Sequence, residues 1–418
     1  MKKVILLIIF AFILRLGISL LAEHGDVINY YYWSKDIFLH GLSGFYEREV
    51  PNAMHPNYPP ITSYLFWGTA ALQGLIWKIA WFINLKIPSF PSNFIFWWES
   101  AKGWYFINKL PAILADLGII YLLYSFVKKL KNEKVGFWAA AVFAFNPVFF
   151  YNSSLWGQTE SICAFFMLLA FYFLTFGKSV SAIVSYLLSL LTKPSMYFAL
   201  PVFLFYWLKK TKLRKILISL LILIVITFVL HIPFHPQGTI TWMVDFYQNI
   251  LKGPLNYLVA NSFNLWGLLF GFDNRPDTVK FLGLPAYFIA YALFIVFLIW
   301  LIAFLYKNKS KEGLTALFAG ALLSFAAFLF LPRMHERYFY PVLVLLIPVV
   351  ALNKKLRSIY FALSFIHLIN LYHFWWVPKV DFLIKVLSNI YVEKIFIMAN
   401  FACFFWLIKV FNKEYAKE

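Results

Sequence analysis

The chain has 418 residues, of which 62% are hydrophobic and 13% are charged, and its formal net charge is +19. Its mean hydropathy of +0.74 is far too high for a soluble globular protein, so the composition predicts a polytopic membrane protein. Lysines and arginines occur in short clusters between apolar runs and form no continuous basic face. This pattern argues against a nucleic-acid partner.

The first apolar run, residues 4–22, follows a basic start and in that respect resembles a signal peptide. We favour a retained first transmembrane helix, because the run approaches the ~20 residues that span a bilayer and contains Arg15. Cys163 and Cys403 both lie in apolar runs, where a thiol behaves as a small hydrophobe. Their spacing predicts neither a disulfide framework nor a metal site.

Basic clusters set the expected orientation, because short cytoplasmic loops are enriched in lysine and arginine. We place five clusters on the cytoplasmic side: residues 128–134, 209–215, 307–311 and 353–357, and the C-terminal KVFNKEYAKE. With the N-terminus inside, residues 4–22 cross outward and residues 106–127 cross back inward. Residues 23–105 then form a large extracytoplasmic first loop.

That first loop contains a further apolar stretch, PPITSYLFWGTAALQGLIW, which would break the topology if it crossed the membrane. We therefore expect interfacial helices at residues 30–45 and 59–80, of which the second is interfacial or re-entrant. The remaining spans are expected near residues 135–152, 159–176, 180–192, 195–208, 216–232, 282–306, 313–331, 338–352, 358–377 and 391–410.

The predicted fold is all-α, with about twelve transmembrane helices and both termini in the cytoplasm. Residues 1–418 form one integral membrane domain, and no stretch is left for a separate soluble domain. Only residues 23–105 and 233–281 are long external segments. A shaped site is therefore expected at the outer membrane face.

Several polar motifs fall at this outer face. Asp26 follows the first span in HGDVINYYYW, where a helix cap or a solvated acid is the plainer interpretation. Tyr58 precedes Pro59 and Pro60, which give a rigid entry into the next helix. The other motifs are YNSSLWGQTE at residues 151–160, LLTKPS at 190–195 and LPRMHERYFYP at 331–341.

In this order, the motifs resemble those of the GT-C superfamily of polytopic glycosyltransferases, which use polyprenyl-phosphate-linked sugars as donors. The likeness is to the dolichyl-phosphoglucose glucosyltransferases of N-glycan assembly and to bacterial GPI-mannosyltransferase-like proteins. It is carried by Gly25-Asp26, the Tyr58-Pro59-Pro60-Ile61-Thr62 motif, Asp116, the YNSSLWGQTE block, Lys193-Pro194 and His335-Glu336-Arg337. Two departures concern the substrate: Arg337 stands where the eukaryotic enzymes typically have lysine, and Glu160 where many relatives have aspartate.

The resemblance implies that Asp26 is the general base. One carboxylate suffices for an inverting transfer, because it removes the proton of the acceptor hydroxyl while a lipid phosphate leaves from the opposite face. The leaving phosphate requires positive charge at the outer interface. The expected phosphate-binding residues are Lys193, Arg333, His335 and Arg337, although snorkelling basic flanks are an alternative interpretation.

Other residues are expected to shape the site. Gln158 and Glu160 could bind sugar hydroxyls and Trp156 could stack on a sugar, or the segment is simply the polar first turn of the next helix. Tyr58, Pro59, Pro60 and Glu336 complete the substrate-binding or site-shaping set. Arg15 and Asp116 lie within spans and are expected to pair with each other or to hold the fold.

No cofactor is expected, since His24, His55, His231 and His235 match no recognised metal-ligand spacing. The resemblance implies a hexosyltransferase with a polyprenyl-phosphate-linked glucose or mannose donor and a glycan, lipid-linked glycan or protein acceptor. A bacterial or archaeal plasma membrane is the expected location, with the site outside. The alternative is a transporter or flippase of lipid-linked sugars, which would be expected to show paired halves with interrupted helices.

Overall fold

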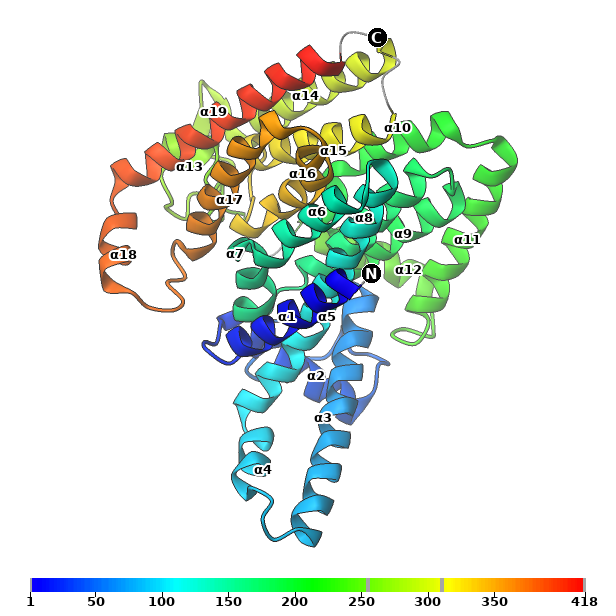
Figure 1. The fold of residues 1–418 in the computed structure, drawn as a ribbon, viewed down its shortest axis with the longest axis vertical. Coiled ribbons are helices and arrows are strands. Elements are labelled where there is room, and N and C mark those ends of the chain that lie inside the picture. The colour runs from blue at the N-terminus through cyan, green and yellow to red at the C-terminus, as the bar shows by residue number, and fades with distance from the viewer. Residues whose placement is uncertain (1, 253–255, 309–311, 416–418) are drawn as a thin grey trace.

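The computed structural model describes residues 2–252, 256–308 and 312–415 (Figure 1). Almost every regular element in these ranges is a helix. The strands within them are β1 (Lys280–Phe281) and β2 (Leu284–Pro285), which form one small antiparallel hairpin. The expected all-α class is therefore confirmed. Two of the basic clusters used to orient the chain extend into residues 309–311 and 416–418, which lie outside the described ranges.

Five helices in the described ranges are long and apolar enough to cross a membrane: α5 (Ala101–Leu130), α11 (Leu213–His231), α14 (Ala286–Lys307), α15 (Glu312–Phe330) and α19 (Ile390–Tyr415). A sixth candidate is the bent pair formed by α6 (Glu133–Phe145) and the segment Pro147–Trp156. These helices confirm a multi-pass membrane protein. The figure of about twelve crossings stays a prediction.

Each of the twelve expected spans is nevertheless largely helical. The further helices are α1 (Lys2–Ser19), α8 (Glu160–Thr175), α9 (Ser179–Thr192), α10 (Leu200–Lys210), α16 (Tyr340–Leu352) and α17 (Arg357–Tyr372). Several are interrupted where the sequence requires it, because proline lacks a backbone donor and clashes with the preceding turn. The path bends by 46° at Asn146-Pro147, and a 3-10 turn, η2 (Pro194–Ala199), follows the break at Lys193.

The first loop contains α2 (Gly25–His40), α3 (Pro60–Lys86) and α4 (Ser92–Glu99). The interfacial helix expected at 30–45 begins five residues earlier and ends at Gly41, whose φ of +77° suits glycine, so residues 41–45 are not helical. Figure 1 shows α3 and α4 extending away from the main bundle, beside the start of α5. Helix α3 does not meet the criteria for a span, and its interfacial location stays a prediction.

Shorter elements occur in the expected connections and also within the span expected at residues 135–152, which bends at Asn146-Pro147 and is not one continuous helix. They are α7 (Pro147–Phe150), the π-helix η1 (Tyr151–Trp156), α12 (Thr239–Lys252), α13 (Leu265–Phe270), η3 (Glu336–Phe339), η4 (Lys354–Leu356) and α18 (Asp381–Leu387). Helix α12 packs on α11, and its Trp242 and Phe246 join an aromatic cluster with Tyr46 of the first loop. The external segments are thus folded against each other.

A buried ion pair ties the first helix to the core. Arg15 on α1 donates from Nε to Asp116 on α5 at 2.7 Å, and both side chains are fully buried. Ser153 of η1 donates to the same carboxylate at 2.6 Å, and Arg15 also reaches the carbonyl of Ala144 on α6 at 3.0 Å. The predicted pairing of Arg15 with Asp116 is confirmed, and it fixes α1, α5, α6 and η1 together behind the outer loops.

Candidate active site

The N-terminus of α2 positions Asp26. His24 is the N-cap, and its Nδ1 accepts a hydrogen bond from the backbone N–H of Asp26 at 3.4 Å. The imidazole is buried between Trp156 and Trp375, with ring centroids 4.0 and 4.4 Å away. Burial lowers the pKa of His24 to about 3, so the ring is neutral. Asp26 therefore lies in the first helical turn, where the helix dipole favours a carboxylate.

A sharp turn after η1 brings a second segment to Asp26. Gly157 ends the π-helix with φ +86°, and its N–H donates to the carbonyl of Asn152 at 3.1 Å. A Cβ at this position would lie 2.9 Å from Cγ of Lys109, so both the conformation and the space require glycine. The turn directs Trp156 and Gln158, on either side of Gly157, toward the same carboxylate.

Asp26 is held through one oxygen. Trp156 donates from Nε1 to Oδ2 of Asp26 at 3.0 Å, and the amide of Gln158 donates to the same oxygen. The guanidinium of Arg337 lies 4.0 Å from Oδ2 as well. Within the part of the chain that the structure describes, Oδ1 has no hydrogen-bond partner. The carboxylate is thus oriented from behind and keeps one oxygen for a substrate proton.

Gln158 joins Asp26 to a buried ion pair. Its Oε1 accepts from Nζ of Lys193 at 3.1 Å and from the hydroxyl of Tyr30 at 3.2 Å. Nζ of Lys193 also donates to Glu160 at 2.6 Å. Burial is the largest single effect and disfavours the charged ammonium, but Glu160 together with Tyr58 and Tyr338 outweighs it, and the pKa of Lys193 is raised above its ordinary value. Lys193 is therefore a permanent cation.

Arg337 lies among three carboxylates. Its guanidinium is 3.2 Å from Glu336, 3.6 Å from Glu160 and 4.0 Å from Asp26. Burial raises the pKa of Glu336 to about 7, although Arg337 opposes this shift. A guanidinium has five N–H donors, and among the described residues Arg337 makes one hydrogen bond, to Glu336. The other N–H groups of Arg337 are therefore available to bind an anion.

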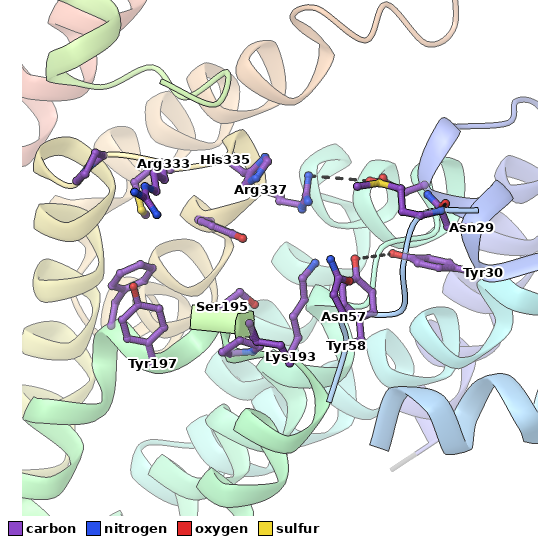
Figure 2. Close-up of a pocket in the computed structure, with 18 of the residues that line it drawn as sticks. Asn29, Tyr30, Asn57, Tyr58, Lys193, Ser195, Tyr197, Arg333, His335 and Arg337 are labelled. Carbon is purple, nitrogen blue, oxygen red and sulfur yellow. Dashed lines mark hydrogen bonds and ion pairs between the residues drawn. The ribbon is translucent and has the colours of Figure 1, made fainter. Parts of the chain in front are cut away.

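These residues border a cavity of about 370 Å³ (Figure 2). Figure 2 shows Lys193, Ser195 and Tyr197 on the wall opposite Asn29 and Tyr30, with Arg333, His335 and Arg337 along another side. The cavity is lined by Asp26, Asn29, Tyr30, Trp33, Met54, Asn57, Tyr58, Lys193, Pro194, Ser195, Tyr197, Phe198, Ile250, Tyr291, Pro332, Arg333, Met334, His335, Arg337, Tyr338 and Trp375. Seven segments of the chain meet there: residues 26–33, 54–58, 193–198, 250, 291, 332–338 and 375.

Two of the expected phosphate-binding residues differ in character from Lys193 and Arg337. Arg333 lines the cavity but donates to Asp277 at 2.7 Å, on the 256–285 segment. Burial, together with the positive charges of Arg337 and Lys193, lowers the pKa of His335 well below its ordinary value. His335 is therefore neutral, and any contact it makes to a phosphate is a hydrogen bond without an ionic contribution.

The cavity brings together Asp26, Tyr58, Lys193, Arg333, His335 and Arg337, as the sequence predicted. Trp156, Gln158, Glu160 and Glu336 lie one layer behind it and are fully buried. The faces of Trp156 meet His24, Arg337 and Trp375, so its indole supports Asp26 and is not a free stacking surface. Pro59 and Pro60 begin α3 and fix the position of Tyr58, without lining the cavity themselves.

Sequence reasoning missed several residues of the site. Tyr30 lies one helical turn after Asp26 on α2, and this spacing could have identified it. Asn57 and Ser195 line the cavity with polar atoms that have no partner among the described residues. Asn57 precedes Tyr58 and Ser195 ends the LLTKPS motif, but neither residue was assigned to the site. Trp375 lies in the loop after α17, and no feature of the sequence indicated that it would line the cavity.

The described residues contain no group of three or more His, Cys, Asp or Glu side chains able to hold a metal ion. Metal independence stays a prediction, because it concerns the reaction and not only the residues. The four histidines considered above are dispersed or hydrogen-bonded elsewhere. His231, for example, contacts the hydroxyl of Tyr247 at 2.9 Å.

The fold has a solved counterpart. It is similar to the crystal structure of ArnT from Cupriavidus metallidurans bound to undecaprenyl phosphate, with a TM-score of 0.51 and 13% sequence identity. The match covers 99% of this chain and 77% of that chain. ArnT is a GT-C glycosyltransferase, so the structural likeness agrees with the GT-C fold that the motifs indicated. No protein-family model matches the sequence, and no curated protein matches it significantly.

Proposed function

We propose that the protein is an inverting glycosyltransferase that moves a sugar from a polyprenyl-phosphate-linked donor to an acceptor hydroxyl at the extracytoplasmic membrane face. The observation that carries the proposal is one carboxylate and two buried cations around a single cavity, on a fold shared with ArnT. Asp26 is the base, and Lys193 and Arg337 bind the phosphate. No cofactor takes part.

The geometry of Asp26 supports the role of base. A general base must reach the acceptor proton at hydrogen-bond distance, and Oδ1 is the oxygen that no described residue occupies. The donors on Oδ2 fix the plane of the carboxyl group, so its free lone pairs have a defined direction. Because a lipid phosphate is already a good leaving group, a second carboxylic acid is unnecessary for its departure.

The two cations support binding of the departing phosphate. Negative charge grows on the phosphate oxygen during transfer, and preorganised donors in a site shielded from water stabilise it most effectively. Arg337 offers a planar fork and Lys193 a point charge, both held in place by Glu160. Arg333 lines the same cavity and extends the positive lining toward the 256–285 segment.

The sugar is proposed to be a hexose, glucose or mannose, as the motifs imply. ArnT itself transfers 4-amino-4-deoxy-L-arabinose, so the fold is compatible with more than one sugar. The proposed acceptor is a glycan, a lipid-linked glycan or a protein. A bacterial or archaeal plasma membrane supplies the polyprenyl phosphate in this proposal.

The test uses purified protein reconstituted in liposomes with undecaprenyl-phosphate-linked glucose or mannose and a panel of glycan acceptors. Asp26→Asn is expected to lower turnover by ~10²- to 10⁴-fold while donor binding persists. Asp381→Asn is a suitable control, since its side chain is 89% exposed and does not line the cavity. Equal turnover in wild type and Asp26→Asn would contradict the assignment of Asp26 as the general base.

The same reconstituted system distinguishes the proposed glycosyltransferase from the transporter alternative. If the wild type binds the donor but yields no glycoside with any acceptor, movement of the intact lipid-linked sugar between leaflets becomes the measurement. A wild-type rate of such movement above that of protein-free liposomes, without any product, would replace the proposal with transport.

A further inference from the structure

A second cavity lies outside the candidate site, between α6 and α17. It has a volume of about 430 Å³. On α6 it is lined at Trp138, Val142 and Phe145, spaced as one face of a helix, and on α17 by Phe361 and Phe365. Phe361 and Phe365 are about half exposed, so the groove opens on the outer surface of the bundle.

One end of this groove carries positive charge. Arg357, one helical turn before Phe361 on α17, stacks its guanidinium over the ring of Trp138 at 4.2 Å from the centroid. Its Nε is buried and has no hydrogen-bond partner among the described residues. Lys354 and Lys355 are exposed in the preceding turn, η4. The carboxylate of Glu414 accepts a hydrogen bond from Asn353 at 2.6 Å, and no acidic side chain pairs with Arg357 among the described residues.

The other end of the groove is neutral. Asn146 donates to Ser364 at 2.9 Å, so the two polar side chains satisfy each other and offer no charge. From Trp138 to Pro147 the groove follows α6 for ~14 Å, which is about half of a ~30 Å hydrocarbon core and therefore the depth of one leaflet. The charged end is the end that the basic-residue rule places in the cytoplasm.

We propose that this groove binds an anionic phospholipid of the cytoplasmic leaflet, with an acyl chain between α6 and α17 and its phosphate on Arg357. The groove has the apolar lining that a chain requires and the length of a single leaflet. At its charged end, the guanidinium of Arg357 stacks on the lining residue Trp138, and its Nε has no hydrogen-bond partner among the described residues. Lys354 and Lys355 add attraction for a negatively charged headgroup over a zwitterionic one. The site is separate from the donor cavity and independent of the proposed transferase activity.

The test is native mass spectrometry of the detergent-solubilised protein titrated with phosphatidylglycerol or phosphatidylcholine. The wild type is expected to take up one phosphatidylglycerol with about 5- to 10-fold higher affinity than phosphatidylcholine. Arg357→Gln is expected to abolish that preference. Arg214→Gln, an exposed arginine on α11 with the same change of charge, is expected to retain it.

Ala141→Phe tests the groove itself, because Ala141 lines it and a phenyl ring there fills the space while Arg357 stays in place. Binding of both phospholipids to this site is expected to fall. Equal affinities in Arg357→Gln and Arg214→Gln, or unchanged binding in Ala141→Phe, would overturn the proposal. Displacement of the phospholipid by undecaprenyl phosphate would overturn it too, and would assign the groove to a prenyl chain. A dimer that Ala141→Phe dissociates would assign it to a second copy.

Discussion

The indole Nε1 of Trp156 donates to Oδ2 of Asp26 at 3.0 Å, across 130 residues of sequence. This contact links the π-helix η1 to the first turn of α2. It is made to Oδ2 and not to Oδ1, which has no hydrogen-bond partner among the described residues. The bond therefore orients the proposed base without occupying the oxygen that would accept the proton.

Trp156→Phe keeps the ring and removes that donor. Because a hydrogen bond to a charged group typically contributes ~1.5–3 kcal/mol, we expect kcat to fall by roughly 10- to 100-fold with little change in donor affinity. Trp207→Phe is the matched control, since its Nε1 donates to the carbonyl of Ser179 at 2.8 Å, on helices that do not line the cavity. A variant of Trp156 with wild-type kcat would show that the bond does not orient the base.

The contributions of the Lys193–Glu160 pair to stability and to donor binding can be measured separately. Lys193→Met removes the nearer of the two cations beside buried Glu160 and leaves Arg337 at 3.6 Å. Because breaking a buried ion pair typically costs up to about 3–5 kcal/mol, a lower thermal midpoint and weaker donor binding are both expected. The double variant Lys193→Met/Glu160→Met removes both charges and is expected to recover stability. Donor binding should remain weak in the double variant, because the phosphate still lacks its ammonium. Recovery of donor binding along with stability would mean that Lys193 is purely structural.

The Arg15–Asp116 pair is expected to stabilise the fold without contributing to chemistry. Asp116→Asn leaves the guanidinium of Arg15 uncompensated in the core, at a cost of roughly 3–5 kcal/mol, and should lower the thermal midpoint in detergent. Glu133→Gln, which weakens the exposed pair with Lys128, should leave the midpoint unchanged. Per folded molecule, Asp116→Asn is expected to retain activity within a few-fold; a loss as large as that of Asp26→Asn would place Asp116 in the reaction.

The raised pKa of Glu336 predicts that the stability of the protein depends on pH in a specific way. Its pKa rises from an ordinary 4.5 to about 7 on folding, so between these values the folded state binds more protons than the unfolded state. Stability from this group is present at low pH and is lost as pH rises through about 7. The shift corresponds to roughly 3 kcal/mol. Relative to wild type, Glu336→Gln should therefore be more stable at pH 8 than at pH 5.

Thermal midpoints at the two pH values measure this effect. Glu47→Gln is the control, because Glu47 is exposed on the first loop and its carboxyl stays in water in both states. The difference between Glu336→Gln and wild type should grow with pH, while that between Glu47→Gln and wild type stays constant. A difference for Glu336→Gln that is the same at pH 5 and pH 8 would contradict a raised pKa.

The sequence by itself determined the class of protein and the helical segments, because membrane spans need only length and apolarity, and both are local properties. The helix break at Lys193-Pro194 was also predicted, since the expected spans end at 192 and resume at 195. The bend at Asn146-Pro147 lies inside the span expected at 135–152 and was not predicted, although proline acts on its own turn. The motifs further indicated which residues would meet, and Asp26, Tyr58, Lys193, Arg333, His335 and Arg337 do line one cavity.

Only the tertiary structure decided what each of those residues can do. Trp156 and Gln158 were expected to face a sugar, but Gly157 turns them onto Oδ2 of Asp26 from behind. His335 was expected to carry charge, and burial beside two cations keeps it neutral. Burial, hydrogen-bond partners and electrostatic fields arise from segments distant in the chain, so they exist only once those segments pack together.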